Sequence, residues 1–302
     1  MITPPRQQVP GVYHRRIGEI TVTALSDGYL DSGLEMLRNI TVEESARLLH
    51  AAFRPDFPAG GRRTSVNCYA IYSAGRLALI DTGSGNYLQP STGKLARNLA
   101  AAGIDPAAIE RVILTHMHPD HSAGLSELPS GRRFFPNAEL VVHENEPRHW
   151  HDDAAMARGS EREKKLYFQA AREQIAPYRD RIRTFSGPGE VFPGVSAMPL
   201  YGHTPGHTGY LITSGGVSLL IWGDIVHVPE IQVPRPEVTI DFDTDPAQAA
   251  ATRRRVLEMA ASERLLVAGM HLHFPGFAHI VHNAGSYALV PEAWDQALGK
   301  LE

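Results

Sequence analysis

Hydrophobic positions along the chain recur at the spacings of many short strands. Residues 18–27 alternate apolar and polar side chains, as a half-buried strand does. Residues 66–72 and 76–80 are two apolar runs joined by Ser73-Ala74-Gly75, which predicts a hairpin. Further apolar runs predict strands at 112–114, 139–142, 195–200, 208–213, 217–222 and 265–268.

Helical spacing separates these runs and defines the fold class. Residues 92–102, about 144–150, 160–178 and roughly 246–261 are expected to be helices. The order predicts an α/β fold with two β-rich halves, each carrying helices. Residues 1–17, rich in proline and arginine, are expected to form an irregular N-terminal arm. No repeat or linker interrupts residues 18–302, so these are expected to form one domain.

Composition excludes several classes of partner. The chain has 302 residues, a net charge of −4 and an isoelectric point near 6.4, which argue against binding to nucleic acid or to an anionic membrane. The first residues lack an apolar core, so no signal peptide is expected and the predicted location is cytoplasmic. The single cysteine, Cys68, lies in an apolar run and is expected to be a buried small residue.

The segment T-H-M-H-P-D-H (115–121) concentrates three histidines and an aspartate directly after a predicted strand. Imidazole nitrogens and carboxylate oxygens are ligands for a borderline metal such as zinc. His116 and His118 point the same way in an extended segment, and Pro119 favours a turn that aims Asp120 and His121 elsewhere. This arrangement suits two neighbouring metals better than one.

Three later loops at predicted strand ends offer further ligands. They read G-H-T-P-G-H-T-G (202–209), G-D (223–224) and G-M-H-L-H (269–273). A carboxylate at the end of an apolar strand is costly to bury unless it is paired or metal-bound. His203, by contrast, is expected to be structural, and Asp27 and Asp81 are expected to brace loops.

The ordered set L-I-D-T-G (79–83), T-H-M-H-P-D-H, T-P-G-H-T (204–208), G-D and G-M-H resembles the metallo-β-lactamase superfamily. Within it, T-A-L-S-D-G (23–28) and H-L-H-F-P-G-F-A-H-I (271–280) are most similar to the methyl parathion hydrolase and quorum-quenching lactonase-like group. The resemblance implies an αββα sandwich with a dinuclear metal site at one edge of the sheets. It also makes a homodimer the expected oligomer.

Carried over by position, the resemblance implies seven metal ligands. One metal ion takes His116, His118 and His207, the other takes Asp120, His121 and His271, and Asp224 bridges them. His273 competes with His271 for the last place. Two zinc ions are the expected cofactors, with manganese, cobalt or iron as alternatives.

The implied mechanism is hydrolysis by a hydroxide that two metal ions about 3.5–4 Å apart share. Asp120 is expected to pass a proton to the leaving group. His227, three residues after Asp224, stands where homoserine lactonases carry tyrosine, and is expected to contact the substrate. By the same resemblance, Trp150 and Phe168 are candidates for an apolar substrate wall, with a place in the helix core as the alternative.

The leading function is therefore a metal-dependent hydrolase of apolar lactones, esters or phosphotriesters. An iron-dependent oxidoreductase of the same fold, acting on persulfide or oxygen, is the alternative, because iron accepts similar ligands. A nuclease of this fold is disfavoured by the acidic chain, which lacks room for a nucleic-acid clamp. A non-catalytic binding module is disfavoured by the full set of ligands.

Overall fold

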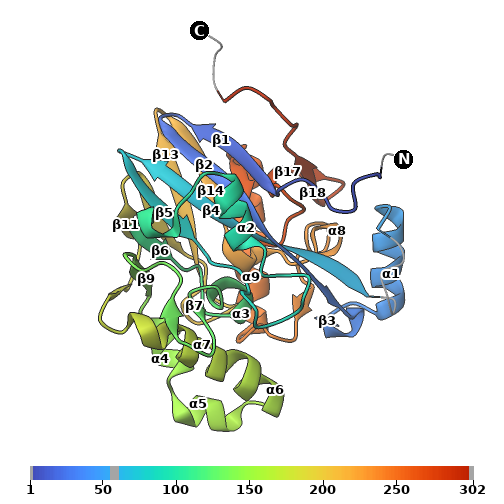
Figure 1. Cartoon of the computed structure of the whole chain (residues 1–302). Coiled ribbons are helices and arrows are strands. Elements are labelled where there is room, and N and C mark those ends of the chain that lie inside the picture. The colour runs from blue at the N-terminus through green and yellow to red at the C-terminus, as the bar shows by residue number, and fades with distance from the viewer. Residues whose placement is uncertain (1–2, 55–60, 299–302) are drawn as a thin grey trace.

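The computed structural model describes residues 3–54 and 61–298. Two seven-stranded sheets form its centre (Figure 1). The first has the order β1 (Val12–Ile17), β2 (Ile20–Ser32), β4 (Arg62–Ser73), β5 (Arg76–Ile80), β6 (Arg111–Ile113), β9 (Glu139–His143) and β10 (Ile182–Phe185). The second has the order β11 (Gly189–Phe192), β12 (Val195–Pro199), β13 (Thr208–Ser214), β14 (Val217–Ile221), β16 (Leu266–Ala268), β17 (Phe277–Asn283) and β18 (Ser286–Pro291).

Helices and two small ribbons complete the fold. The α-helices are α1 (Val42–Ala51), α2 (Leu95–Ala101), α3 (Pro119–Ser122), α4 (Asn145–Trp150), α5 (Asp153–Arg158), α6 (Glu161–Glu163), α7 (Ala170–Ile175), α8 (Pro229–Gln232) and α9 (Pro246–Ser262). Between α6 and α7 lies a π-helical segment, η4 (Lys164–Gln169), and the 3-10 turns are η1 (Leu34–Met36), η3 (Pro106–Ala108), η5 (Ala176–Tyr178) and η6 (Gly223–Ile225). The ribbons pair β3 (Leu37–Arg38) with β15 (Thr239–Ile240) and β7 (Ser126–Glu127) with β8 (Arg132–Arg133).

Alternation along the strands builds the layers. Successive strand residues point to opposite faces, so Tyr69 and Ile71 of β4 enter the core between the sheets, whereas Cys68 and Ala70 face the core beneath α2. The second sheet likewise has one face in the core between the sheets, and its other face packs on α9. The predicted αββα sandwich is thereby confirmed, and Cys68 is buried as expected.

Several elements differ from the sequence prediction. Residues 12–17, expected to lie in an irregular arm, form β1 and pair with β2, because backbone pairing overrides their charged composition. The helix expected over 92–102 begins only at Leu95, whose backbone N–H donates to the Asp27 carboxylate. Strands β17 and β18 and helix α1 were not predicted. Of the helices that the structure describes, none is long and apolar enough to span a membrane.

A buried tyrosine links the two sheets beside the histidine-rich segment. Tyr210 of β13 is fully buried, and its hydroxyl donates to the Leu114 carbonyl at 2.6 Å. We predict that Tyr210→Phe lowers the free energy of unfolding by about 1–2 kcal/mol, because one buried hydrogen bond is lost. Urea denaturation measures this loss. The control Tyr72→Phe alters a half-exposed ring and should change stability by less than about 0.5 kcal/mol; equal effects of the two substitutions would contradict the prediction.

Candidate metal centre

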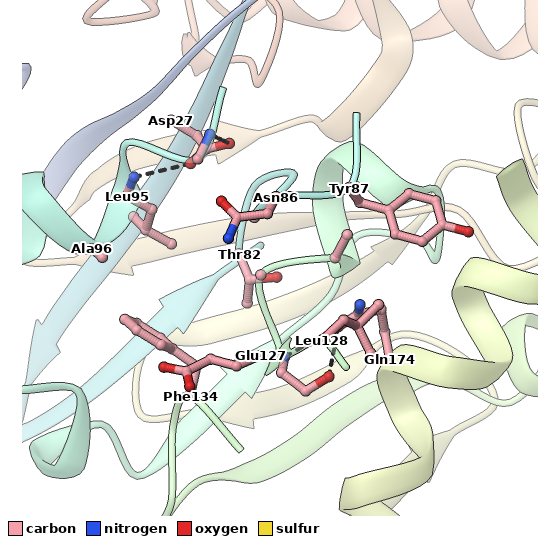
Figure 2. A pocket seen from close by; sticks show the side chains of 15 residues that line it. Asp27, Thr82, Asn86, Tyr87, Leu95, Ala96, Glu127, Leu128, Phe134 and Gln174 are labelled. Atoms are coloured by element: carbon pink, nitrogen blue, oxygen red, sulfur yellow. Dashed lines mark hydrogen bonds between the residues drawn. The ribbon is translucent and has the colours of Figure 1, made fainter. Parts of the chain in front are cut away.

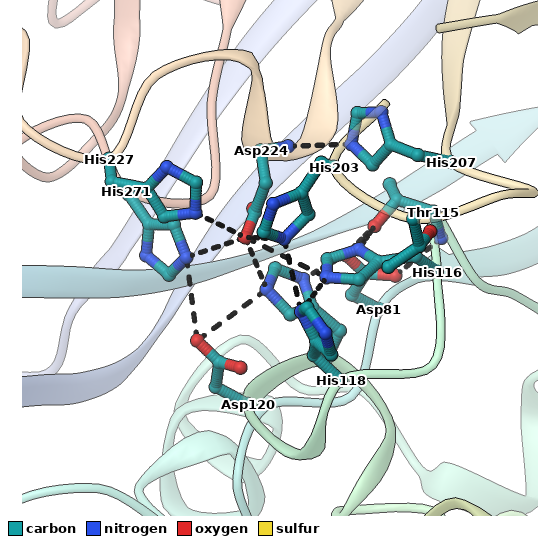
Figure 3. Close-up of polar contacts among 12 residues, drawn as sticks. Asp81, Thr115, His116, His118, Asp120, His203, His207, Asp224, His227 and His271 are labelled. Atoms are coloured by element: carbon teal, nitrogen blue, oxygen red, sulfur yellow. Dashed lines mark hydrogen bonds and ion pairs between the residues drawn. The ribbon is translucent and has the colours of Figure 1, made fainter. Parts of the chain in front are cut away.

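The histidine-rich segment and the later loops meet at one edge of the sandwich. β6 runs in parallel with β5 and β9, and β14 runs in parallel with β16, so the carboxyl ends of these strands lie together. β6 leads into residues 115–121, β14 into Asp224, and β16 into His271. Figure 3 shows that side chains from these loops point toward one another around Asp224.

Three histidines form the first group of candidate ligand atoms. His118 Nδ1 lies 3.0 Å from His116 Nε2 and 3.0 Å from His203 Nε2, and all three rings are buried. Nitrogens about 2.0–2.1 Å from a tetrahedral zinc ion lie roughly 3.3 Å apart. The spacing of these nitrogens therefore fits one metal ion, and the three residues form a possible ligand set.

A second group lies on the other side of Asp224. Asp120 Oδ2 is 3.5 Å from His121 Nε2 and 3.4 Å from His271 Nε2. These three atoms again lie close enough to share one ion. The competing residue His273 is exposed and binds Glu230 instead, so the structure favours His271 at this place.

One oxygen of Asp224 stands between the two groups. Asp224 Oδ2 lies 3.3 Å from His203 Nε2 and 3.7 Å from His116 Nε2 in the first group. It also lies 3.2 Å from His121 Nε2 and 3.1 Å from His271 Nε2 in the second. A carboxylate in this position could contact two ions, which is the place that the sequence prediction gives to Asp224.

Unsatisfied buried atoms support a fit to metal ions. His121 Nε2 and Asp224 Oδ1 are buried and have no hydrogen-bond partner. Burial lowers the pKa of His116 and of His118 well below the usual range, so these rings are neutral and keep a lone pair for a metal. Burial also disfavours charge on His203, but Asp224 and Asp243 outweigh it and raise its pKa to about 9. Asp224 and Asp243 thus favour a positive charge beside them, and a bound cation would provide it.

His203, and not the predicted His207, faces this centre. Both ring nitrogens of His207 are already bonded to backbone: Nδ1 lies 2.8 Å from the Leu200 carbonyl, and Nε2 accepts from the Asp224 N–H at 2.8 Å. His207 packs beneath Gly223, whose φ is +61° and whose added Cβ would lie 2.4 Å from His207 Nε2. The geometry therefore favours His203 over His207 as the third nitrogen of this group, the reverse of what the sequence predicted.

Comparison with known proteins places this arrangement in a family. The sequence pattern of the metallo-beta-lactamase superfamily matches residues 61–271. The chain belongs to the metallo-β-lactamase superfamily. Among solved structures, the hydrolase AbOPH of the β-lactamase superfamily is 31% identical with a TM-score of 0.89, over 96% of this chain and 100% of that one. AidC, a dizinc quorum-quenching lactonase in complex with the product N-hexanoyl-L-homoserine, is 25% identical with a TM-score of 0.88, over 95% and 99%.

Curated relatives match smaller parts. An atrochrysone carboxyl ACP thioesterase of Passalora fulva is 36% identical over 81 residues, which are 27% of this chain and 22% of the relative. The uncharacterized protein YobT of Bacillus subtilis (strain 168) is 26% identical over 162 residues, or 53% and 61%. The chain thus spans less than two thirds of either relative. Family membership and the solved structures confirm the predicted resemblance and support a metal-dependent hydrolase.

In this metallo-β-lactamase chain, a second ring of groups orients the candidate ligands. A metal-binding histidine usually donates its other N–H to a carboxylate or carbonyl, which fixes the ring. The pairs are His121 Nδ1 with Asp81 Oδ2 at 2.7 Å, His203 Nδ1 with Asp243 Oδ1 at 2.7 Å, His271 Nδ1 with the Ser65 carbonyl at 2.8 Å, and His116 Nδ1 with Thr115 Oγ1 at 3.1 Å. Asp81 therefore acts as a brace, as expected.

Glu146, which no sequence pattern singled out, ties two ligand loops together. This carboxylate on α4 is fully buried. Its Oε2 accepts from the backbone N–H of Met117 at 2.8 Å, and its Oε1 accepts from Thr204 Oγ1 at 2.5 Å and from the Gly206 N–H at 2.8 Å. Glu146 thereby sets the loop of His116 and His118 against the loop of His203. Nothing in the sequence distinguishes this glutamate from the other acidic residues of the helical region.

A cavity of 280 Å³ opens onto the candidate metal centre. Asp120, His118 and His271 form its floor, and Leu166, Tyr167 and Phe242 are among its apolar walls. His227, only 3% exposed, also lines it. Neither ring nitrogen of His227 has a hydrogen-bond partner, although Nε2 lies 3.1 Å from Asp224 Oδ2.

Trp150 and Phe168 do not line this cavity. Both are buried in the core between the first sheet and α4 and α7, and they wall a neighbouring cavity of 320 Å³. His118, Tyr167 and Phe242 line both cavities. In the cavity that Asp120 and His271 line, apolar side chains come instead from the π-helical segment η4, which contributes Leu166 and Tyr167.

A third cavity, of 440 Å³, is lined by Asp27 among others and has no histidine in its lining (Figure 2). The Asp27 carboxylate accepts from the backbone N–H groups of Ser84, Gly93 and Leu95 at 2.8, 3.1 and 2.9 Å. Burial raises the pKa of Asp27 to about 6. These contacts make Asp27 a brace for the loop that precedes α2, as the sequence analysis expected.

The choice between His203 and His207 is testable by metal content. We predict that His203→Ala lowers the zinc retained after saturation and gel filtration by about one equivalent, because one of three nitrogen ligands is lost. The matched variant His207→Gln keeps an acceptor for the Asp224 N–H and should retain the full zinc content. Elemental analysis of both proteins decides the matter. The reverse pattern would restore the original prediction.

Proposed function

We propose that this chain is a dinuclear, zinc-dependent hydrolase that cleaves lactones or esters, with phosphotriesters as a further substrate class. The observation that carries the proposal is Asp224 Oδ2, which stands within 3.7 Å of four histidine nitrogens from two separate ligand groups. Manganese, cobalt and iron accept similar ligands. The ring-opened product N-hexanoyl-L-homoserine bound to AidC supports lactone hydrolysis, and the hydrolase AbOPH supports hydrolysis in general.

The residues that would hold the metal ions are His116, His118, Asp120, His121, His203, Asp224 and His271. When bound, two such ions would activate water for attack and polarise the oxygen of the scissile carbonyl or phosphoryl group.

Asp120 can act as the proton carrier. Burial alone would raise its pKa, but His121 and His271 outweigh burial and lower it, so the carboxylate is ionised. Its side chain is 16% exposed, against 2% for Asp224, so it reaches the cavity. An ionised carboxylate beside the reacting centre can accept the proton of the attacking water and return it to the leaving group.

His227 is suited to contact the substrate oxygen. Burial lowers its pKa to about 4, so the ring is neutral above that pH and donates from one nitrogen only. Its backbone N–H donates to Gln232 Oε1 at 2.7 Å, and its ring stacks on His271 with centroids 5.2 Å apart. These contacts fix the ring at the boundary between the metal centre and the cavity.

We predict two zinc equivalents per chain and hydrolysis that a chelator abolishes and zinc restores. The assay is a panel of lactones, aryl esters and phosphotriesters with zinc-, manganese- and cobalt-loaded protein, together with elemental analysis. Asp224→Asn should remove turnover while circular dichroism stays unchanged, because both ions lose their shared anionic ligand. At most one equivalent after saturation would contradict a dinuclear centre. An iron-loaded protein that consumes oxygen but hydrolyses nothing would favour the oxidoreductase alternative.

We predict that His227→Ala lowers kcat about 10- to 100-fold, which corresponds to roughly 1.4–2.8 kcal/mol of transition-state stabilisation. Metal content should stay unchanged, because the proposed ligand set is complete without His227. However, His227 Nε2 lies close enough to His203 and Asp224 to share an ion with them. Metal analysis and kcat are therefore measured on one preparation: lost zinc would make His227 a ligand, and full zinc with full activity would leave it without a catalytic role.

A further inference from the structure

A buried arginine shares the cavity with the candidate metal centre. Arg62 is the first residue of β4, lies opposite Ser32 of β2, and is only 4% exposed. It lines the 280 Å³ cavity together with Asp120 and His271. No step of the proposed hydrolysis uses this side chain.

The Arg62 guanidinium group has no ion-pair partner among the described residues. Nη1 donates to Thr64 Oγ1 at 3.0 Å, whereas Nε is buried without an acceptor. Among residues 3–54 and 61–298, no carboxylate oxygen lies within 4.0 Å of an Arg62 nitrogen. Burial lowers the pKa of Arg62 to about 10, against the opposing charges of Asp120 and Glu35, and still leaves the group charged at neutral pH. An unpaired buried charge is expensive, so its retention calls for an anionic contact that none of the residues described by the structure supplies.

Two nearby carboxylates, Asp120 and Glu35, favour the charged form of Arg62, but neither forms an ion pair with it among the described residues. Asp31 is bound by Arg63, with Arg63 Nε 2.8 Å from Asp31 Oδ1. Asp120 belongs to the candidate metal centre, where positive ions would outweigh its charge. A second cation, Arg162, is exposed and lines the same cavity. The cavity is therefore a positively charged site.

The other residues that line the cavity indicate what kind of molecule would carry the anionic group. Most of the other walls are apolar and consist of Leu30, Met36, Leu88, Leu166, Tyr167 and Phe242. A small inorganic anion would leave these walls without contact. A molecule with an apolar body, a scissile acyl bond at the metal centre and an anionic group at Arg62 would satisfy all three features.

We propose that the preferred substrates are esters or lactones that carry a carboxylate, and that Arg62 binds this carboxylate away from the scissile bond. The inference rests on the proposed hydrolase function. A guanidinium is the side chain best suited to hold a carboxylate, because its planar donors match the two oxygens. Arg62 is thus a specificity-determining residue of the cavity.

Paired probes that differ only in charge test the proposal. Zinc-loaded protein is assayed with the mono-4-nitrophenyl ester of glutaric acid and with the methyl ester of that compound. We expect kcat/KM to be at least about tenfold higher for the carboxylate probe. Arg62→Met should remove about 10- to 100-fold of kcat/KM on the carboxylate probe and leave the neutral probe within about threefold. Arg62→Lys should recover part of the preference, and the exposed control Arg76→Met should keep all of it.

A binding measurement separates this inference from the proposed function. Calorimetry with the monoanilide of glutaric acid, which resists hydrolysis, should show binding that Arg62→Met weakens at least about tenfold, whereas the methyl ester of the anilide binds both proteins alike. Binding that depends on Arg62 without any ester hydrolysis would overturn the hydrolase and leave the recognition intact. Hydrolysis without preference for the carboxylate would overturn the recognition alone. Equal losses on both probes would make Arg62 structural, and if Arg62→Met fails to fold, the preference of the unaltered protein decides.

Discussion

One carboxylate oxygen organises this metallo-β-lactamase chain. Asp224 Oδ2 lies within 3.7 Å of five imidazole nitrogens in a region that is almost closed to water. Transferring so many polar groups from water costs several kcal/mol per charge unless positive charge compensates the carboxylates. The fold brings the carboxyl ends of strands from both sheets to one edge. Cations bound at this edge could supply the compensating positive charge.

The position of Asp224 Oδ2 is held by residues that lie outside the candidate ligand set. His207 binds the backbone N–H of Asp224, and Glu146 joins the loop after β6 to the loop after β12. Tyr210 carries a hydrogen bond from the second sheet to Leu114, just before the histidine-rich segment. Because these bonds are buried, they are strong constraints on distance. The metal centre is therefore shaped by groups that act on the backbone of its ligand loops.

These supporting contacts are long-range, and the sequence did not predict them, whereas it did predict features that depend on local patterns. The H-x-H-x-D-H spacing singled out His116, His118, Asp120 and His121 as candidate ligands, and the pattern of apolar residues identified most strands of the two central sheets, since both patterns are local. The choice between His203 and His207 depends on which loop side faces the sheet edge, and four residues of spacing leave that choice open. Glu146 has no local signature, because its partners come from two distant loops. Trp150 and Phe168 were recognisable as buried aromatic residues, but their spacing does not say which cavity they wall.

The metal centre and the cavity walls come from different parts of the architecture, and this separates reaction from specificity. The candidate ligands follow strands of the two central sheets, whose geometry fixes the kind of bond that can be broken. The walls come from outside these sheets or from their rim. Leu166 and Tyr167 lie in a π-helical segment, Phe242 lies in the loop after β15, and Arg62 is the first residue of β4. Such segments can change without disturbing strand pairing, so a shared superfamily fold says little about the substrate. Where substrate preference is concerned, the charge and shape of these walls outweigh the identity of the ligands.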